Sequence, residues 1–468
     1  MKERNKRLFH NTFIIGIGTV ISKTTQYVIL ALCTYWMSTS EYGIADICVS
    51  TASLIVPVVT IDISQAAFRF SKEKNLKGLL TFASIVSVLG PAICFLLLPL
   101  SYTFPQVGSY WLLISCLVLF ESIFNSLKEY TRGSEKSKTY VIGGVINAII
   151  QTASCFLFVY MLTMGINGYL LALCVGYFSE SVFIFFSMKV YSLIDLSSLD
   201  KKEIKEYVKF SLPLMPNTLM WWIISISDRY FVLFMINDSA AGIYSVAAKI
   251  PALISVVATL FFKAWEMSAI AEKDSTDKEE YTSNMFRRLV AVVSISISGL
   301  LIILRPLLGV LVSPDFYEGW QYATVLIVAA GFSACQAFVG TAYTVEKDSL
   351  GCLKTTFVTA VLNIVLNYFL ISSLGIMGAA ISTLISYAVV LVYRLFDTRK
   401  YIKISTNWLV FVFVFLIIVI ESLSLSYFPE WYLVISLVSF LLVILMHFKL
   451  LKNDAMQLFS RIKDSEEK

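Results

Sequence analysis

Long apolar runs separated by short polar breaks form the pattern of this chain. A run of about twenty apolar residues is long enough to cross a bilayer as an α-helix. The runs of this kind cover residues 12–37, 43–67, 79–100, 109–127, 140–162, 168–188, 211–235, 241–266, 289–312, 319–345, 355–373, 376–393, 405–426 and 431–448. The short alternating strands of a membrane barrel do not occur in the pattern. The sequence therefore predicts an all-α polytopic membrane protein with fourteen transmembrane helices.

The positions of Lys and Arg test both the number of spans and their orientation, because short cytoplasmic loops hold an excess of these residues. Of the 37 basic residues, 32 fall in the N-terminal head, in alternate connections and in the C-terminal tail, all on one side of a fourteen-span arrangement. The opposite connections, such as 163–167, 236–240 and 313–318, contain none. Both termini are therefore predicted to face the cytoplasm.

Short motifs recur in the two halves of the chain in the same order. Tyr42-Gly43-Ile44 matches Ala241-Gly242-Ile243 at a separation of 199 residues, and Gly165-Ile166-Asn167-Gly168 matches Gly375-Ile376-Met377-Gly378 at 210. Apolar segments also resemble each other by composition alone, but the shared order of the matches favours a repeat. We therefore expect two parallel six-helix bundles around a central cavity, plus two extra C-terminal helices.

This repeat sets the expected domain organisation. The predicted N-terminal six-helix lobe covers residues 1–190, and the C-terminal six-helix lobe covers 205–400. Transmembrane helices 13 and 14 occupy 401–450, and a cytoplasmic tail follows at 451–468.

Composition narrows the possible function. The chain is 57% hydrophobic and 15% charged, whereas soluble domains are about 45–50% apolar and about 25% charged, so a soluble globular enzyme is excluded. The net charge of +5 is scattered rather than gathered on one face, which argues against nucleic-acid binding. The sequence has two histidines and lacks Cys-x-x-Cys pairs, phosphate-binding loops and hydrolase motifs. We therefore expect no catalytic residue, no metal and no cofactor.

Five charged residues lie deep within predicted spans and are the candidate substrate-binding residues: Lys23, Asp62, Asp228, Arg229 and Lys249. A charge at the centre of a transmembrane helix costs about 2.5–3.5 kcal/mol, so such residues usually face a partner or a wet cavity. They fall on the first, second, seventh and eighth predicted helices, the equivalent pairs of the two repeats. Together they predict a shared cavity with more positive than negative charge, suited to a phosphate or an acidic sugar.

The neighbours Asp228 and Arg229 point about 100° apart on their helix, so one is expected to pair across the bundle interface while the other faces the cavity. Asp46 lies at a similar depth. Glu121 and Glu180 have no obvious partner, and helix–helix hydrogen bonding and a functional role both remain open for them.

Several motifs resemble one known family of transporters. They are Ser40-Glu41-Tyr42-Gly43-Ile44 after the first span, Asp228-Arg229-Tyr230 on the seventh, Gly242-Ile243-Tyr244 with Lys249 at the eighth, and Gly375-Ile376-Met377-Gly378-Ala379 before the twelfth. The chain is similar to the bacterial polysaccharide flippases, which are O-antigen and capsule repeat-unit exporters of the multidrug/oligosaccharidyl-lipid/polysaccharide exporter superfamily.

The resemblance implies that the chain moves an undecaprenyl-pyrophosphate-linked oligosaccharide across the bacterial cytoplasmic membrane by alternating access. The cavity residues would hold the pyrophosphate or acidic sugars, and the family pattern supports Arg229 and Lys249 better than Lys23. The implied partners are the lipid-linked oligosaccharide, membrane lipid and other polysaccharide-assembly membrane proteins.

Two alternatives remain. A cation-coupled multidrug exporter of the same superfamily would usually have twelve spans and an acid-rich cavity. A membrane polysaccharide polymerase would need a large outer loop with catalytic residues, and the predicted outer loops are short.

Overall fold

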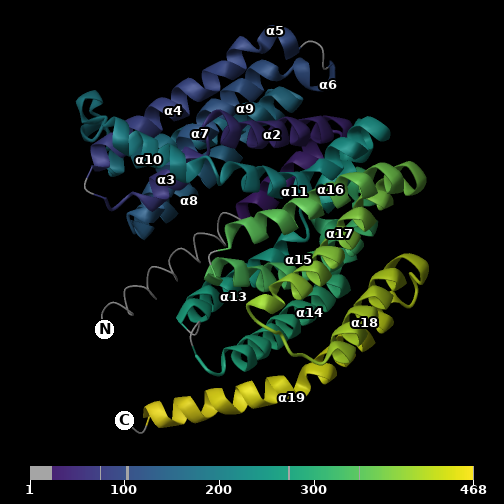
Figure 1. Ribbon diagram of the computed structural model, residues 1–468. Coiled ribbons are helices and arrows are strands. Elements are labelled where there is room, and N and C mark those ends of the chain that lie inside the picture. Colours follow the sequence, from purple (N-terminus) through teal and green to yellow (C-terminus); the bar gives the residue numbers. More distant parts are fainter. Residues whose placement is uncertain (1–23, 74, 102–104, 272–274, 347, 467–468) are drawn as a thin grey trace. The chain divides into compact units, whose positions relative to one another are not determined.

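In the computed structural model, residues 24–466 except 74, 102–104, 272–274 and 347 are described, and these residues form helices and no strand (Figure 1). A helix over residues 24–36 comes first. It is followed by α2 (Thr39–Val59), α3 (Ile63–Arg69), α4 (Leu76–Leu96), α5 (Leu98–Ser101), α6 (Pro105–Gly108), α7 (Trp111–Gly133), α8 (Ser137–Cys155), η1 (Phe156–Met161), α9 (Gly165–Ser187), η2 (Val190–Ser192), η3 (Leu196–Ser198), α10 (Lys201–Ser211) and α11 (Met215–Met235). The chain continues with α12 (Asp238–Ala247), α13 (Ala252–Ala271), α14 (Lys278–Leu311), η4 (Pro314–Phe316), α15 (Gly319–Glu346), α16 (Ser349–Leu374), α17 (Ile376–Asp397), η5 (Thr398–Lys400), α18 (Trp408–Tyr427) and α19 (Tyr432–Glu466).

Within the described residues, 12 helical segments are long and apolar enough to cross a membrane, and each overlaps one of the predicted spans. The two other predicted spans are 12–37, which lies partly outside the described residues, and 211–235, which contains α11. Helix α11 is long enough to cross, but it is less apolar because it carries Asp228, Arg229 and several hydroxyl side chains. The helical fold is thus confirmed, and the number of fourteen spans stays a prediction.

Two of the predicted spans contain a turn of three or four residues well inside their length. The span 43–67 divides into α2 and α3 at Thr60–Asp62, where Ile61 and Asp62 adopt positive φ angles of 53° and 49°. The span 241–266 divides into α12 and α13 at a turn over residues 248–251. Pro57 and Pro251 lie beside these breaks, and proline cannot supply the backbone N–H that a continuous helix requires.

The described residues cluster into two compact units. The first holds residues up to 243 together with 311–316, and the second holds 244–310 and 317–468. In the first unit, α7 packs against α2, α3, α4 and α9; in the second, α15 packs against α13, α17 and α18. Helix α11 belongs to the first unit, although the sequence predicted that the second lobe would begin at residue 205. The predicted lobe boundaries stay a prediction.

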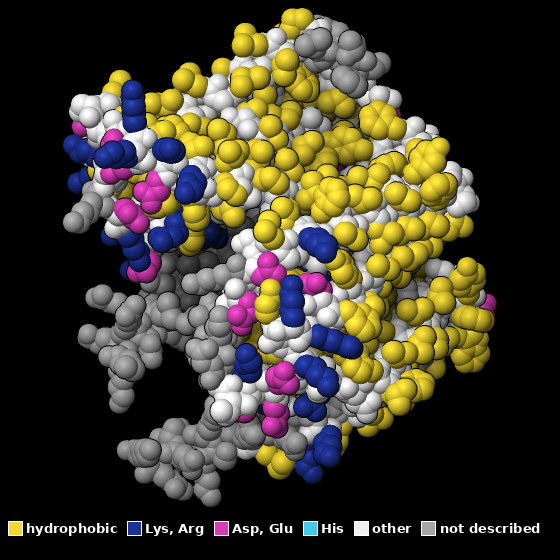
Figure 2. Space-filling view, in the orientation of Figure 1, with side chains coloured by type: hydrophobic (Ala, Val, Ile, Leu, Met, Phe, Trp, Pro, Cys, Tyr) yellow, Lys and Arg dark blue, Asp and Glu magenta, His cyan; other side chains and the backbone are white. Residues whose placement is uncertain are grey.

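One end of the first unit gathers the basic connections predicted to share a side of the membrane. Lys72 contacts Glu135, the Asn75 side chain donates to the Ser198 carbonyl at 3.0 Å, and Lys77 Nζ lies 3.9 Å from Asp195 Oδ2. Three connections far apart in sequence therefore meet at this end. Figure 2 shows Lys and Arg side chains gathered over this end of the unit, next to a largely hydrophobic surface.

Helix α10 covers the same end of the first unit. Asp200 caps its first turn, and its lysines stay exposed while Tyr207 is buried. The Tyr207 ring lies 5.2 Å from that of Phe70 and belongs to a buried cluster with Ile63 and Leu79. Burial, with Glu203 and Glu206 nearby, raises the pKa of Tyr207 to about 12. Helix α10 is thus an amphipathic helix held on α3 and α4 by its apolar face.

The opposite end of the first unit contains two glycines in close contact. Ser38 and Glu41 form a capping box that begins α2, and Gly43 follows in the first turn. A Cβ atom on Gly43 would collide with the Asp238 carbonyl, and one on Gly242 would collide with the Thr39 carbonyl. Helices α2 and α12 therefore approach at a point where only glycine fits.

The sequence repeat has structural counterparts. Helices α2 and α12 begin 199 residues apart, at Thr39 and Asp238, the separation of the first motif match. In the second match, Gly165 and Gly375 both adopt positive φ, 53° and 59°, at the starts of α9 and α17. The matched segments thus occupy equivalent local positions in the two halves of the chain.

Candidate functional site

The candidate site lies along the contact between α2 and α11 in the first unit. Its most strongly charged contact is an ion pair in which Arg229 Nη1 lies 2.7 Å from Asp46 Oδ2. The Arg229 side chain is 15% exposed and that of Asp46 is 5% exposed, so the pair is largely removed from solvent. A buried Arg229 needs an opposite charge beside it, because leaving one member of a buried ion pair without the other costs about 3–5 kcal/mol. Asp46 supplies that charge.

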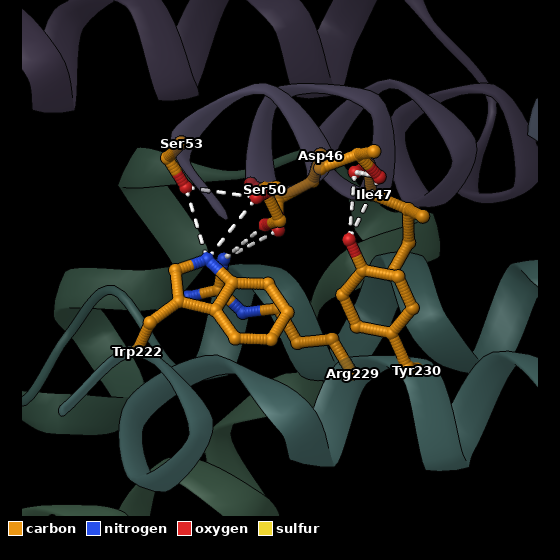
Figure 3. A network of polar contacts seen from close by, with 8 residues as sticks. Asp46, Ile47, Ser50, Ser53, Trp222, Arg229 and Tyr230 are labelled. Carbon is orange, nitrogen blue, oxygen red and sulfur yellow. Dashed lines mark hydrogen bonds and ion pairs between the residues drawn. The ribbon is translucent and has the colours of Figure 1, made fainter. Parts of the chain in front are cut away.

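Four further side chains of α11 and α2 surround this pair. Trp222 Nε1 donates to the Ser50 carbonyl and to Ser53 Oγ, both at 3.1 Å. The hydroxyls of Tyr230 and Thr51 are hydrogen-bonded at 2.7 Å. Figure 3 shows Trp222, Arg229 and Tyr230 extending from α11 toward the facing side of α2. Together these contacts form a polar layer inside two otherwise apolar helices, which we call the α2–α11 layer.

Asp62 closes the α2–α11 layer at the other end of α2. It is buried at the break between α2 and α3, and its Oδ2 accepts a hydrogen bond of 2.9 Å from Thr218 Oγ1 on α11. Thr218 therefore contacts the end of α2, whereas Arg229 contacts its first half. The two helices run antiparallel, which is the direction that the predicted orientation requires of the second and seventh spans.

The remaining predicted residues have different positions. Asp228 is buried in the first unit. Its neighbour Arg229 reaches Asp46 on α2. Lys249 belongs to the second unit and lies half-buried in the turn between α12 and α13. Lys23 lies outside the described residues. The structure thus brings Arg229 and Asp62 into one polar layer, and a cavity shared with Lys249 and Lys23 stays a prediction.

Sequence reasoning noted the depth of Asp46 but did not select it. A signal was present, because Asp46 and Arg229 are opposite charges on the second and seventh spans, which belong to the equivalent pairs of the two repeats. The serines and threonine of α2 gave no signal, since Ser and Thr also occur in transmembrane helices as ordinary packing residues. Only the rotation of α2 against α11 reveals which hydroxyls face the layer.

Another buried charge in the first unit also has a partner. Glu180 on α9 is fully buried, 3.5 Å from Lys128 Nζ on α7, and its Oε2 accepts a 2.9 Å hydrogen bond from Asn147 on α8. Helix–helix hydrogen bonding was one of the two interpretations that the sequence left open for Glu180, and these contacts join helices. Lys128 lies within α7, and this cluster joins three helices. In the described residues, no group of three or more His, Cys, Asp or Glu side chains could hold a metal ion.

The long apolar helices define a multi-pass helical membrane protein. A family model described as "Polysaccharide biosynthesis protein" matches residues 8–265, more than half of the chain. The chain therefore belongs to the polysaccharide biosynthesis protein family, as its resemblance to the polysaccharide flippases suggested.

One curated relative matches part of the chain. Over 170 residues the chain is 26% identical to "Probable low-salt glycan biosynthesis flippase Agl15" of Haloferax volcanii. This match spans 35% of each chain, about a third of the relative's length.

Solved structures of similar fold include two kinds of transporter. A multidrug resistance MATE family transporter of the MOP superfamily, in an inward-facing conformation, is similar with a TM-score of 0.66 and 13% identity, over 81% of this chain and 94% of that one. The lipid II flippase MurJ, in an inward closed conformation, is similar with a TM-score of 0.66 and 17% identity, over 94% of this chain and all of that one. At these identities the likeness shows a common fold.

Proposed function

We propose that the chain is a flippase that moves a lipid-linked oligosaccharide repeat unit, carried on undecaprenyl pyrophosphate, across the bacterial cytoplasmic membrane by alternating access. Arg229 and Lys249 would hold the anionic headgroup, with Lys23, Asp62 and Asp228 as further cavity residues. In this proposal both termini face the cytoplasm, and the chain works beside other membrane proteins of polysaccharide assembly. It is a transporter rather than an enzyme.

The observation that carries this proposal is Arg229 in the α2–α11 layer. An arginine placed deep in a transmembrane helix is retained only where it has a specific partner or task. Its guanidinium presents planar donors that fit phosphate oxygens. Family membership and the glycan flippase among its relatives support the same substrate class.

A cation-coupled multidrug exporter is the second candidate, and the fold shared with a multidrug resistance transporter favours keeping it. The two functions differ in the charge of the cargo. An exporter of organic cations would work better without a positive charge in its site, whereas a carrier of pyrophosphate-linked glycans would fail without it. A polysaccharide polymerase receives no comparable support.

The test is to replace Arg229 and Lys249 singly with alanine in the cell that carries the gene. We expect each variant to accumulate lipid-linked repeat units on the cytoplasmic face and to lose most surface polysaccharide. The expected loss of transport is tenfold or more, about 1.4 kcal/mol or above, since a charge-assisted contact to the headgroup is removed. Extracted lipid-linked intermediates and surface polysaccharide are the two measurements.

Membrane levels of each variant, measured by immunoblot, serve as the folding control. Arg305→Lys serves as a control at another arginine within a span. The Arg305 guanidinium stacks on the rings of Trp320 and Tyr432, at 4.8 and 5.0 Å, and is not part of the α2–α11 layer. Normal surface polysaccharide in both alanine variants, or increased efflux of ethidium by Arg229→Ala, would contradict the flippase proposal.

A further inference from the structure

Asp46 occupies the position at Arg229 that a bound anion would need. The carboxylate lies 2.7 Å from Arg229 Nη1, a distance typical of a charge-assisted hydrogen bond. Both side chains lie within the α2–α11 layer, where little solvent screens them. A headgroup phosphate that binds Arg229 must therefore compete with Asp46.

The pairing also changes what the layer can attract. With Asp46 ionised, the Arg229–Asp46 pair is neutral overall. If Asp46 moves away, Arg229 loses its negative partner, and a neutral sugar cannot supply another negative charge. A phosphate or pyrophosphate can replace it, because it brings its own negative charge and several acceptor oxygens. The pair thus selects anionic over neutral ligands.

The same competition helps release. A transporter must bind its cargo firmly enough to load it and weakly enough to let it go. When a phosphate replaces the carboxylate beside Arg229, one ion pair is exchanged for another. The free energy then changes much less than when a phosphate binds a buried arginine that has no partner. Ser50 Oγ, 3.5 Å from Arg229 Nη1, lies at the same position and can accept from the guanidinium during the exchange.

We propose that Asp46 is a specificity-determining residue: an internal anion that neutralises Arg229 in the empty site, yields it to the phosphate of the cargo headgroup, and reclaims it on release. This inference rests on the proposed function and assigns Asp46 a role that the sequence did not. Asp46 touches the same guanidinium as the headgroup rather than the headgroup itself.

The experiment measures binding of inorganic pyrophosphate to the full chain, purified in detergent, by titration calorimetry. We expect Asp46→Asn to bind pyrophosphate at least about tenfold more tightly than the unmodified chain, because the competing charge is gone. The same variant should transport more slowly in cells, since release is slowed. Asp46→Glu keeps the competing charge and should bind pyrophosphate within about threefold of the unmodified chain.

Two further variants complete the test. Glu180→Gln neutralises another buried carboxylate of an ion pair in the same unit and should leave pyrophosphate affinity unchanged. In an Arg229→Ala background, Asp46→Asn should bring no gain in affinity, because the residue for which it competes is missing. Thermal unfolding of each variant confirms that a folded chain is being titrated.

The outcomes separate the two proposals. If Arg229→Ala loses transport but Asp46→Asn binds pyrophosphate no more tightly than the unmodified chain, the role of Asp46 is overturned and the flippase proposal stands. If Arg229→Ala transports normally and no variant binds pyrophosphate, both are overturned. An equal gain of affinity in Asp46→Asn and Glu180→Gln would reduce the effect to overall charge and would also overturn the role of Asp46.

Discussion

Arg394 shows how a single side chain can be assigned to the wrong environment by its sequence position. Its place near the end of the twelfth predicted span put it among the basic residues of a cytoplasmic connection. In the structure it lies inside α17 and is buried; its guanidinium donates to Gln336 Oε1 at 2.7 Å and to Thr355 and Thr356 at 3.1 and 3.2 Å. These acceptors are neutral oxygens on α15 and α16. A search for opposite charges in the sequence could therefore not have predicted them as partners of Arg394.

Replacing Arg394 with lysine should destabilise the second unit, although the charge is kept. Lysine carries a single ammonium and cannot reach acceptors on two helices at once, so we expect a loss of about 2–3 kcal/mol in the free energy of unfolding, since hydrogen bonds to a charged group are lost. Thermal unfolding in detergent measures this loss. Arg399→Lys, at an exposed position one turn further on, is the control; equal effects of the two substitutions would contradict the role of the guanidinium geometry.

At the scale of the helices, sequence periodicity placed the segments well but missed their interruptions. Apolar runs predict where a helix crosses, because burial in lipid depends on composition. The breaks at residues 60–62 and 248–251 depend on local backbone geometry instead, and an apolar run with a proline can be either continuous or broken. Composition also could not predict which helices pack closely, since a glycine in a span does not reveal which backbone it faces.

The contact between α16 and α17 depends on one such glycine. A methyl group at Gly378 would collide with the Leu370 carbonyl of the preceding helix. We expect Gly378→Ala to lower the free energy of unfolding by about 1–3 kcal/mol, as overpacking does, measured by thermal unfolding in detergent.

Gly299→Ala on α14 is the matched control for this substitution. There a methyl group would lie 3.5 Å from Phe440 Cε2, an ordinary contact, and alanine favours a helix over glycine by about 1 kcal/mol. This variant should be neutral or slightly stabilised. A stable Gly378→Ala variant would show that α16 and α17 can separate at this point.

For the whole chain, charge distribution was the most informative part of the sequence. The predicted connections at 68–78, 128–139 and 189–210 were grouped on one side by their Lys and Arg residues alone. Contacts between Lys72 and Glu135 and between Asn75 and Ser198 join them at one end of the first unit. The sequence could not identify which charge inside the spans meets which, because that depends on how the helices are rotated. In the α2–α11 layer, the sequence therefore predicted Arg229 and Asp62 as site residues but not the contact of Arg229 with Asp46.

The predicted orientation can be tested with cysteine labelling in intact cells. Glu135 and Thr163 are exposed at opposite ends of the first unit, in connections predicted to be cytoplasmic and external. We expect Thr163→Cys to react with a membrane-impermeant maleimide from outside, and Glu135→Cys to react only after permeabilisation. Cys116 and Cys352, which are partly exposed among the described cysteines, are first replaced by serine. The reverse labelling pattern would invert the topology.

The contact between Gly43 and Gly242 limits which residues the two matched segments can carry. Each glycine lies against the backbone that carries the other. A larger residue in one copy cannot be offset in the other, because no smaller amino acid exists. Substitution is therefore blocked at both positions together.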